Sequence, residues 1–255
     1  MISICLTIKD RSKFIFEGRE IVLFPKVVRS IVEAIRGNED KFEIIVSDFN
    51  STDMPMLDWL PELLNGLNYK IITVNSEFFS RGLGLNTSAA NSSGDTLFFL
   101  DADTTFSKQA ADLLLTYETS GKCFFPIVAD WQDIDHTKFE MYTDSFGNCM
   151  IPKHIFEAVG GWKEWFSWGC EDNILLLTLQ GHGVKIIRHP VDGMFHLWHP
   201  RVPRAYDKPF EEYKDHFHYK NYKNPSRFDV DKFLRERGLD SWIPSKMRYD
   251  EPPER

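Results

Sequence analysis

The sequence predicts an α/β fold in which a mixed, mostly parallel sheet is flanked by helices and followed by a C-terminal extension. Three observations predict it. Short apolar segments rich in β-branched residues alternate with helical patterns between residues 2 and 100. Three acidic residues, Asp10, Asp48 and Asp101, lie at or just after the ends of three of these segments. At 255 residues, the chain is also long enough to bury the core that such a sheet needs.

The first half of the chain supplies most of the predicted sheet. Residues 2–8 (ISICLTI) read as a buried strand. A helix is predicted after Pro25, which suits a first-turn position, from apolar residues at helical spacing: Val27, Val28, Ile31, Val32 and Ile35. Further strands are predicted at 42–50, 70–75 and 96–100, short helices within 55–66, and a helix packed closely on a strand within the small, polar stretch 81–95.

The second half is less regular. Residues 121–128 (GKCFFPIV) predict a strand. Residues 146–200 predict a short helix, a loop rich in Gly and Trp, a helix that begins at Glu171, and two short strands. Beyond residue 200 the segment is charged and interrupted by prolines, with a late helix predicted at 229–238.

Composition excludes several classes of protein. The net charge of −8 argues against a general nucleic-acid binder. The cysteines at 5, 123, 149 and 170 fit neither a zinc spacing nor a disulfide framework, which suits a reducing compartment. The N-terminus enters a strand at once, and no stretch approaches about 18 uninterrupted apolar residues. We therefore expect a soluble cytoplasmic protein, with peripheral contact at the inner face of a membrane left open.

Asp101 and Asp103 follow the apolar strand 96–100 and have three competing interpretations. A D-x-D at a strand end supplies hard oxygen ligands for Mg²⁺ or Mn²⁺, which in turn neutralises a diphosphate. The same residues fit the D-x-D-x-T pattern of a phosphatase, with Asp101 as nucleophile, although that motif belongs on the first strand of its domain. The third interpretation is a solvated strand end without chemistry.

Glu171 and Asp172 open an apolar helix just after a stretch rich in Gly and Trp. Acids at a helix N-terminus are ordinary capping residues, because the helix dipole favours negative charge there. A carboxylate in a Trp-lined cleft is also what a general base requires. The pattern alone leaves both roles open.

Histidines gather near the end of this region, at positions 189, 196 and 199. Their spacing does not fit a helical zinc motif, but a His close after a strand can complete a metal shell as a neutral imidazole.

Near the N-terminus, Asp48 lies in a segment that makes a turn by default and offers a hydrogen-bond acceptor to a base or ribose. Lys9 and Arg11 are placed to meet phosphate.

Taken in order, these motifs resemble those of the inverting GT-A glycosyltransferases, the chondroitin polymerase and β-1,4-galactosyltransferase type. The matching stretches are EIIVSDFNSTD, RGLGLNTSAANSSGDTLFFLDADTTF, MIPKHIFEAVGGWKEWFSWGCEDNILLLTLQGHG and DGMFH. The resemblance implies a Rossmann-like GT-A domain over residues 1–200, with a nucleotide-binding half (1–103) and an acceptor-binding half (104–200). Residues 201–255 form the C-terminal extension.

The resemblance also implies a role for individual residues. Asp172 is the expected catalytic base, and the acceptor would contact Glu171, Trp168 and Trp165. A Mn²⁺ or Mg²⁺ ion would be held by Asp103 and His196, with Asp101 as a further contact and His199 as the fallback ligand. The donor would be bound by Thr7, Lys9, Arg11, Asp48, Arg81, Asp101 and Trp168.

The expected function is metal-dependent, inverting transfer of a sugar from a nucleotide-diphosphate sugar, a UDP-sugar first, to a hydroxyl of a glycan or glycolipid. A phosphatase and a binding module without turnover are the alternatives. The sequence departs from the family pattern at two places, and these bear on the donor contacts and on the shape of the acceptor site. The segment TIKDRS lacks the usual Pro after the first strand, and WGCED carries Cys where Gly is common.

Overall fold

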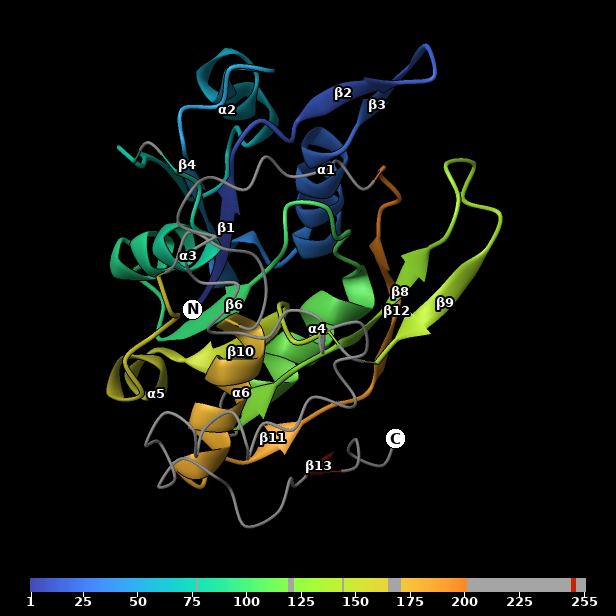
Figure 1. Ribbon diagram of the computed structural model, residues 1–255. Helices are drawn as coiled ribbons and strands as arrows, with labels where there is room; N and C mark the ends of the chain where they lie inside the picture. The colour runs from blue at the N-terminus through green and yellow to red at the C-terminus, as the bar shows by residue number, and fades with distance from the viewer. Residues whose placement is uncertain (77, 119–121, 144, 165–170, 201–248, 251–255) are drawn as a thin grey trace.

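The computed structural model describes all residues except 77, 119–121, 144, 165–170, 201–248 and 251–255. Within that part of the chain, the main sheet has eight strands in the order β13-β11-β7-β10-β6-β1-β4-β5 (Figure 1). Most neighbouring pairs are parallel, and the exceptions both involve β10. The prediction of a mixed, mostly parallel sheet is therefore confirmed.

Four parallel strands form the half of the sheet that comes first in the chain. They are β1 (Ile2–Ile8), β4 (Phe42–Asp48), β5 (Tyr69–Thr73) and β6 (Thr96–Phe99). Every residue of β1, β4 and β6 is buried, as expected for central strands covered on both faces. Ile8 pairs with Asp48, so the carboxyl ends of β1 and β4 lie at the same edge.

The second half of the sheet contains a strand that was not predicted. This strand, β10 (Cys149–Pro152), lies between β6 and β7 (Cys123–Phe124) and runs antiparallel to both. Because it runs in the opposite direction, its first residues meet the carboxyl end of β6. Two short strands complete the sheet: β11 (Ile186–Ile187) and β13 (Tyr249–Asp250).

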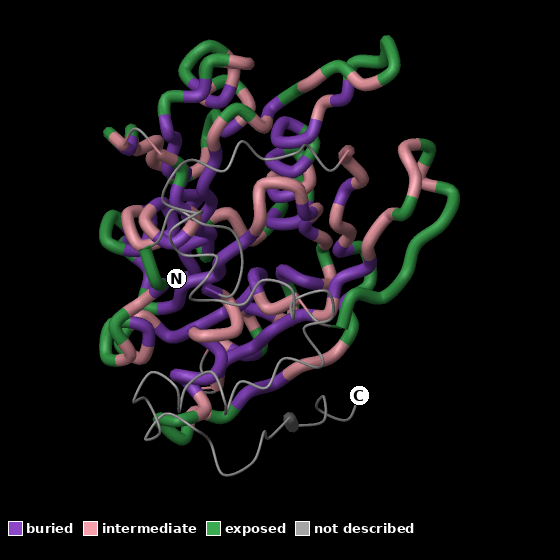
Figure 2. Tube along the Cα trace, in the orientation of Figure 1, coloured by how far each residue is buried: buried purple, intermediate pink, exposed green. Residues whose placement is uncertain are grey.

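Helices cover both faces, and the side chains of β1 show how the core divides. Ile2, Ile4, Leu6 and Ile8 pack in one cluster with α1 (Phe24–Ile35) and α4 (Lys108–Tyr117). Cys5 points the other way, into a cluster with α3 (Arg81–Ala90), α5 (Lys153–Ala158) and α6 (Glu171–Gly181). This alternation follows from the two-residue period of a strand, and the buried layer runs through the centre of the molecule in Figure 2.

The small residues of α3 allow it to lie against the sheet, as the sequence predicts. A Cβ on Gly84 would lie 1.9 Å from Thr7 Oγ1, and one on Gly82 would lie 1.9 Å from the carbonyl oxygen of Lys163. Ser88 Oγ donates to the Leu6 carbonyl oxygen at 3.0 Å. The helix therefore packs directly on the backbone of β1.

One predicted strand, 121–128, is wrong as a single element. Pro126 lacks a backbone N–H and separates β7 from β8 (Ile127–Trp131), which lies in a different sheet. This second sheet has the order β12-β8-β9, with β9 at Phe139–Tyr142 and β12 at Pro190–His196.

Several further elements complete the fold. A hairpin of β2 (Lys13–Phe16) and β3 (Arg19–Val22) and the helix α4 were not predicted. The short helices predicted within 55–66 are η2 (Met56–Asp58) and α2 (Leu60–Leu63), preceded along the chain by η1 (Glu39–Lys41). The helix predicted at 229–238 lies outside the described residues. Over the residues that are described, no helix combines the length and the apolar character needed to cross a bilayer.

Candidate active site

The segment after β6 and the end of β12 are held together by backbone hydrogen bonds. The N–H of Leu197 donates to the Asp103 carbonyl oxygen at 2.7 Å, and the N–H of Thr105 donates to the Phe195 carbonyl oxygen at 2.8 Å. An isolated bridge pairs Thr104 with His196. These bonds bring the D-x-D motif and the C-terminal histidines to one place at the carboxyl edge of the sheet.

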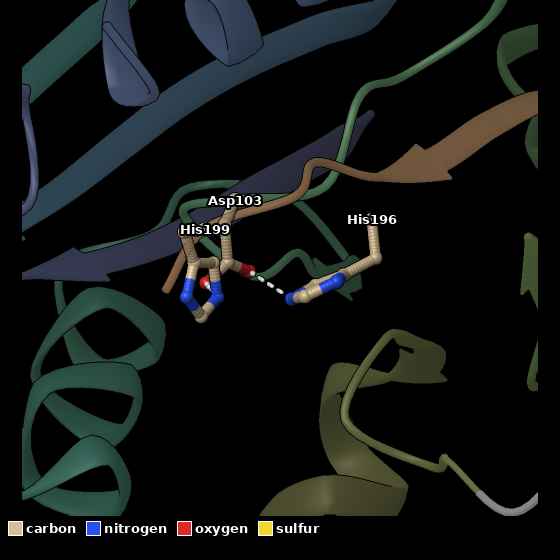
Figure 3. A group of neighbouring side chains, drawn as sticks. All are labelled: Asp103, His196 and His199. Carbon is tan, nitrogen blue, oxygen red and sulfur yellow. Dashed lines mark ion pairs between the residues drawn. The ribbon is translucent and has the colours of Figure 1, made fainter. Parts of the chain in front are cut away.

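Asp103, His196 and His199 form a cluster there, shown in Figure 3. One carboxylate oxygen of Asp103 lies 3.6 Å from Nε2 of His196, and the other lies 3.5 Å from Nε2 of His199. The three residues offer ligand atoms that all lie within 4.8 Å of one another. One carboxylate and two imidazoles form a donor set that suits Mn²⁺, so these residues fit a metal ion.

Electrostatics keep Asp103 ionised. Burial by itself favours its neutral form, but the neighbouring His196, His199 and Arg11 outweigh burial and hold its pKa well below the usual value. Burial likewise opposes the charged form of His196, whereas Asp103 and Asp130 favour it and raise the pKa of His196 to about 10. Without a metal, the Asp103 carboxylate thus lies beside two cations, His196 and Arg11.

The two histidines have different outer partners. Nδ1 of His196 lies 2.7 Å from Oδ1 of Asp130 on β8. Nε2 of His199 lies 2.8 Å from Nη2 of Arg11, which also lies 3.4 Å from Oδ2 of Asp103. Arg11 therefore contacts the carboxylate of the D-x-D motif directly.

Arg81 joins the D-x-D motif to the acidic start of α6. Its Nε and Nη2 both donate to Asp101 Oδ1, at 2.9 and 2.7 Å, and Nη2 also donates to the Gly147 carbonyl oxygen at 2.9 Å. Its Nη1 lies 3.8 Å from Glu171 Oε1, and the guanidinium stacks over Trp162, 4.7 Å from the ring centroid. Asn148 donates to the other Asp101 oxygen at 3.2 Å. Asp101 is thus held by protein groups and does not belong to the Asp103 cluster.

Glu171 and Asp172 are carboxylates with raised pKa values. Burial is the main cause for Glu171, whose pKa rises to about 7 despite the opposing charge of Arg81, and Asp172 adds to the rise. Burial also raises the pKa of Asp172, which accepts hydrogen bonds from the backbone N–H of Phe146 at 3.2 Å and of Asn173 at 2.8 Å. Within the described part of the chain, Glu171 Oε2 is buried and accepts no hydrogen bond.

The predicted nucleoside end lies beyond β1 and β4. Asp48 accepts from the N–H and the hydroxyl of Ser51, at 3.0 and 2.6 Å. Asp10, at a left-handed φ of 48°, accepts from the N–H of Thr52 at 2.7 Å. The hydroxyl of Thr7 donates to the Ser47 carbonyl oxygen at 3.2 Å and faces α3, while Lys9 directly follows β1. Thr7 is therefore part of the packing beneath this end of the site.

Other predicted residues are not in these groups. His189 contacts the hydroxyl of Tyr117 at 3.0 Å and is not part of the Asp103 cluster. Trp165 and Trp168 lie outside the described residues. The roles expected of the individual site residues remain predictions.

Sequence reasoning missed two supporting residues that the fold reveals. Asp130 lies in a strand whose pairing with β12 was not predicted. Asn86 on α3 accepts from the N–H of Trp162 and donates to its carbonyl oxygen, both at 2.9 Å, and so fixes the Gly-Gly-Trp loop. The helical spacing of Asn86 from Arg81 was the available signal for the second role.

Comparison with known proteins assigns the family. The model for glycosyl transferase family 2 matches residues 20–160. The chain belongs to glycosyl transferase family 2. The matched residues include the D-x-D motif of this family 2 chain, whereas Asp172, His196 and His199 come after them.

Two sequence relatives carry a more specific name. Human chondroitin sulfate N-acetylgalactosaminyltransferase 2 is 32% identical over 157 residues, which cover 52% of this chain and 29% of the relative. Mouse chondroitin sulfate N-acetylgalactosaminyltransferase 1 is 28% identical over 211 residues, covering 72% and 40%. This family 2 chain therefore spans less than half the length of these relatives.

Solved structures confirm the GT-A fold. S. aureus TarS 1–349 in complex with UDP-GlcNAc matches with a TM-score of 0.65 at 13% identity, covering 92% of this chain and 70% of that one. A mannosyltransferase from Pyrobaculum calidifontis in complex with GDP-Man and Mn²⁺ matches with a TM-score of 0.60 at 12% identity, covering 95% and 65%. The expected GT-A resemblance is thus confirmed, and at these identities the likeness concerns the fold alone.

Proposed function

We propose that this family 2 chain is a metal-dependent, inverting glycosyltransferase that moves a sugar from a nucleotide-diphosphate sugar to a hydroxyl of a glycan or glycolipid. The single observation that carries the proposal is the meeting of Asp103 with His196 and His199 at the carboxyl edge of the sheet. In open α/β sheets, ligands bind beyond the carboxyl ends of the strands. Arg81 connects this edge to the acidic start of α6.

In the proposed reaction, Asp172 takes the proton of the acceptor hydroxyl. The freed oxygen attacks the anomeric carbon from the face opposite the nucleotide, the bond to the diphosphate breaks, and the anomeric configuration is inverted. Mn²⁺ or Mg²⁺, held by Asp103 and His196, would when bound offset charge on the leaving diphosphate. The raised pKa of Asp172 brings this carboxylate closer to the basicity that proton abstraction requires.

The donor is proposed to be a UDP-sugar. UDP-GlcNAc is bound by one structural neighbour, and the sequence relatives are named for N-acetylgalactosamine transfer. UDP-N-acetylhexosamines are therefore the first donors to test. The glycan or glycolipid acceptor and a peripheral contact with a membrane also belong to the proposal.

The phosphatase alternative has no comparable support. Asp101 would be its nucleophile, yet one Asp101 oxygen accepts from Arg81 and the other accepts from Asn148. Asp101 also follows β6, which lies in the interior of the sheet and comes after β1 in the chain, whereas the phosphatase motif belongs on the first strand of its domain.

The proposal is tested by measuring transfer and donor binding together. UDP-, GDP- and dTDP-sugars are screened by thermal shift with and without Mn²⁺, because a ligand that binds only the folded state raises apparent stability. Donors that bind are then incubated with glycan acceptors, and the anomeric configuration of the product is read by NMR. We expect one nucleotide class to bind only with metal and to give an inverted product. A retained configuration, or release of phosphate from simple esters, would contradict the proposal.

A further inference from the structure

Asp130 lies beside His196 because of strand register. In the pairing of β12 with β8, His196 is the direct partner of Asp130, so both side chains lie on the same face of the small sheet. Oδ1 of Asp130 is 2.7 Å from Nδ1 of His196, a distance typical of a strong hydrogen bond with an ionised acceptor.

Asp130 is itself held in place. Nε2 of Gln132 donates to Oδ2 of Asp130 at 3.0 Å and to the carbonyl oxygen of Asp130 at 3.0 Å. One oxygen of the carboxylate therefore faces the imidazole while the other is fixed by a neighbour on the same chain segment. Such a carboxylate has little freedom to turn away from His196.

This contact selects one tautomer of His196. A carboxylate only accepts hydrogen bonds, so Nδ1 carries a hydrogen, and the neutral imidazole has its lone pair on Nε2. Nε2 is also the atom that lies 3.6 Å from Asp103. The lone pair is thus directed toward the carboxylate of the D-x-D motif.

His199 has different hydrogen-bond partners. Its Nε2 lies 2.8 Å from the guanidinium of Arg11, and its Nδ1 lies 3.1 Å from the carbonyl oxygen of Pro200. A cation therefore occupies the side of His199 that a metal ion would need. The two imidazoles are both near Asp103, but only His196 is backed by a carboxylate.

We propose that Asp130 is a positioning residue that orients His196 as the imidazole ligand of the metal, in preference to His199. The proposal rests on the proposed function, because it needs a divalent cation at Asp103. Carboxylates that support a metal-ligating histidine in this way contribute about 10- to 100-fold to metal affinity. Asp130 acts through His196 and does not touch the substrate in this role.

The test measures Mn²⁺ binding to the full chain by electron paramagnetic resonance of free Mn²⁺, with and without UDP. We expect Asp130→Asn to weaken binding about 10- to 100-fold. In the double variant Asp130→Ala/His196→Ala, the loss of Mn²⁺ affinity should be no greater than in His196→Ala alone, because Asp130 acts through His196. Asp135→Asn is the matched control, since Asp135 lies on the same hairpin and pairs with Arg19 at the surface. Circular dichroism verifies that each variant is folded.

A second readout does not depend on metal. Long-range ¹H–¹⁵N NMR spectra report the hydrogen on Nδ1 of His196 and its hydrogen bonding. We expect a downfield Nδ1–H signal of His196 in the wild type, from the hydrogen bond to Asp130, and a loss of this downfield shift in Asp130→Ala. Equal Mn²⁺ affinity of the Asp130 variants and wild type, or an unchanged Nδ1–H signal, would overturn the positioning role. A wild type with the expected Nδ1–H signal that binds no Mn²⁺, even with UDP, would instead contradict the metal dependence in the proposed function.

Discussion

At the scale of single residues, the site consists of two groups of acids with opposite electrostatics. Asp103 lies beside the cations His196 and Arg11, and its pKa is held low. Glu171 is buried and Asp172 is partly buried at the start of a helix, and their pKa values are raised. Environments that shift the pKa values of carboxylates in opposite directions are typical of sites in which some carboxylates bind ligand and others transfer protons.

The role of Asp172 gives the first prediction. Asp172→Asn keeps the size of the side chain but removes the proton acceptor, so transfer should fall about 10²- to 10⁴-fold. Donor binding should stay near the wild-type value, because Asp172 is not among the predicted donor contacts. Turnover and thermal shift with donor are the measurements. Asp192→Asn, on an exposed position of β12, is the control. Near-normal transfer by Asp172→Asn would remove it as the base.

The raised pKa of Glu171 gives the second prediction. Its folded-state pKa of about 7 exceeds the ordinary value of 4.5 for a glutamate side chain. Between these two pH values the Glu171 carboxyl is ionised in the unfolded chain but still protonated in the folded chain. The free energy of unfolding therefore falls as the pH rises. Glu171→Gln removes this fall and should become more stable relative to wild type between pH 5 and pH 8, by on the order of 2 to 3 kcal/mol.

Urea unfolding at the two pH values measures this difference. Glu157→Gln is the control, because Glu157 is exposed on α5 and should leave the pH dependence unchanged. If the difference between Glu171→Gln and wild type does not vary with pH, Glu171 is already ionised across this range.

At the scale of elements, the close contact of α3 with β1 positions polar residues of the site. Arg81 begins this helix, Gly84 and Ser88 allow it to approach the strand, and Gly82 allows it to approach the backbone of Lys163. The helix places Arg81 against Asp101 and Asn86 against the Gly-Gly-Trp loop. The small residues of 81–95 thus have a packing role that positions polar residues of the same helix.

Gly84→Ala tests this contact and is the third prediction. Alanine improves helix propensity by up to about 1 kcal/mol, but its Cβ would meet Thr7 Oγ1 at 1.9 Å and Phe49 Cε2 at 2.9 Å. Overpacking in a buried site costs about 1 to 3 kcal/mol, which should outweigh the gain in helix propensity. The free energy of unfolding should therefore fall. Thr7→Ala in the same chain removes one of the clashing atoms and should recover part of the loss. A Gly84→Ala variant as stable as wild type would show that α3 can move away from the strand.

The elements also show why the central strands were predicted from the sequence whereas several shorter strands were not. The strands ending at Ile8, Asp48 and Phe99 are buried on both faces, so their apolar runs are distinct. By contrast, β10 has only four residues, and β7 and β8 are joined through Pro126. The helix α4 had a usable signal, since Ser107 caps it by accepting from the Ala110 N–H at 3.1 Å. Asp130 had none, because its importance depends on a long-range register.

At the scale of the whole molecule, the candidate site draws on both halves of the chain. Asp48, Asp101 and Asp103 come from the first 103 residues, and Glu171, Asp172 and His196 come from the rest. A ligand that contacts both halves is released when either half unfolds. Ligand binding should therefore stabilise the chain against global unfolding.

The fourth prediction follows from this linkage. With UDP and Mn²⁺ at about 100 times the dissociation constant, the free energy of unfolding should rise by about 2.7 kcal/mol. Asp103→Asn should lose the part of this gain that depends on Mn²⁺, whereas Asp95→Asn, before the other end of β6, should keep it. Urea titrations with and without each ligand measure the effect. A gain that is the same in Asp103→Asn would place the metal elsewhere.

The place of β10 between β6 and β7 has a consequence for protein synthesis. Until Cys149–Pro152 leaves the ribosome, β6 is an edge strand with apolar side chains on both faces, and such edges invite pairing with other chains. At about 5 to 20 residues per second, the nascent chain carries this open edge for several seconds after Phe99 is made. A stalled or truncated chain that ends before β10 keeps it permanently, and so is expected to aggregate even though its family motif is intact.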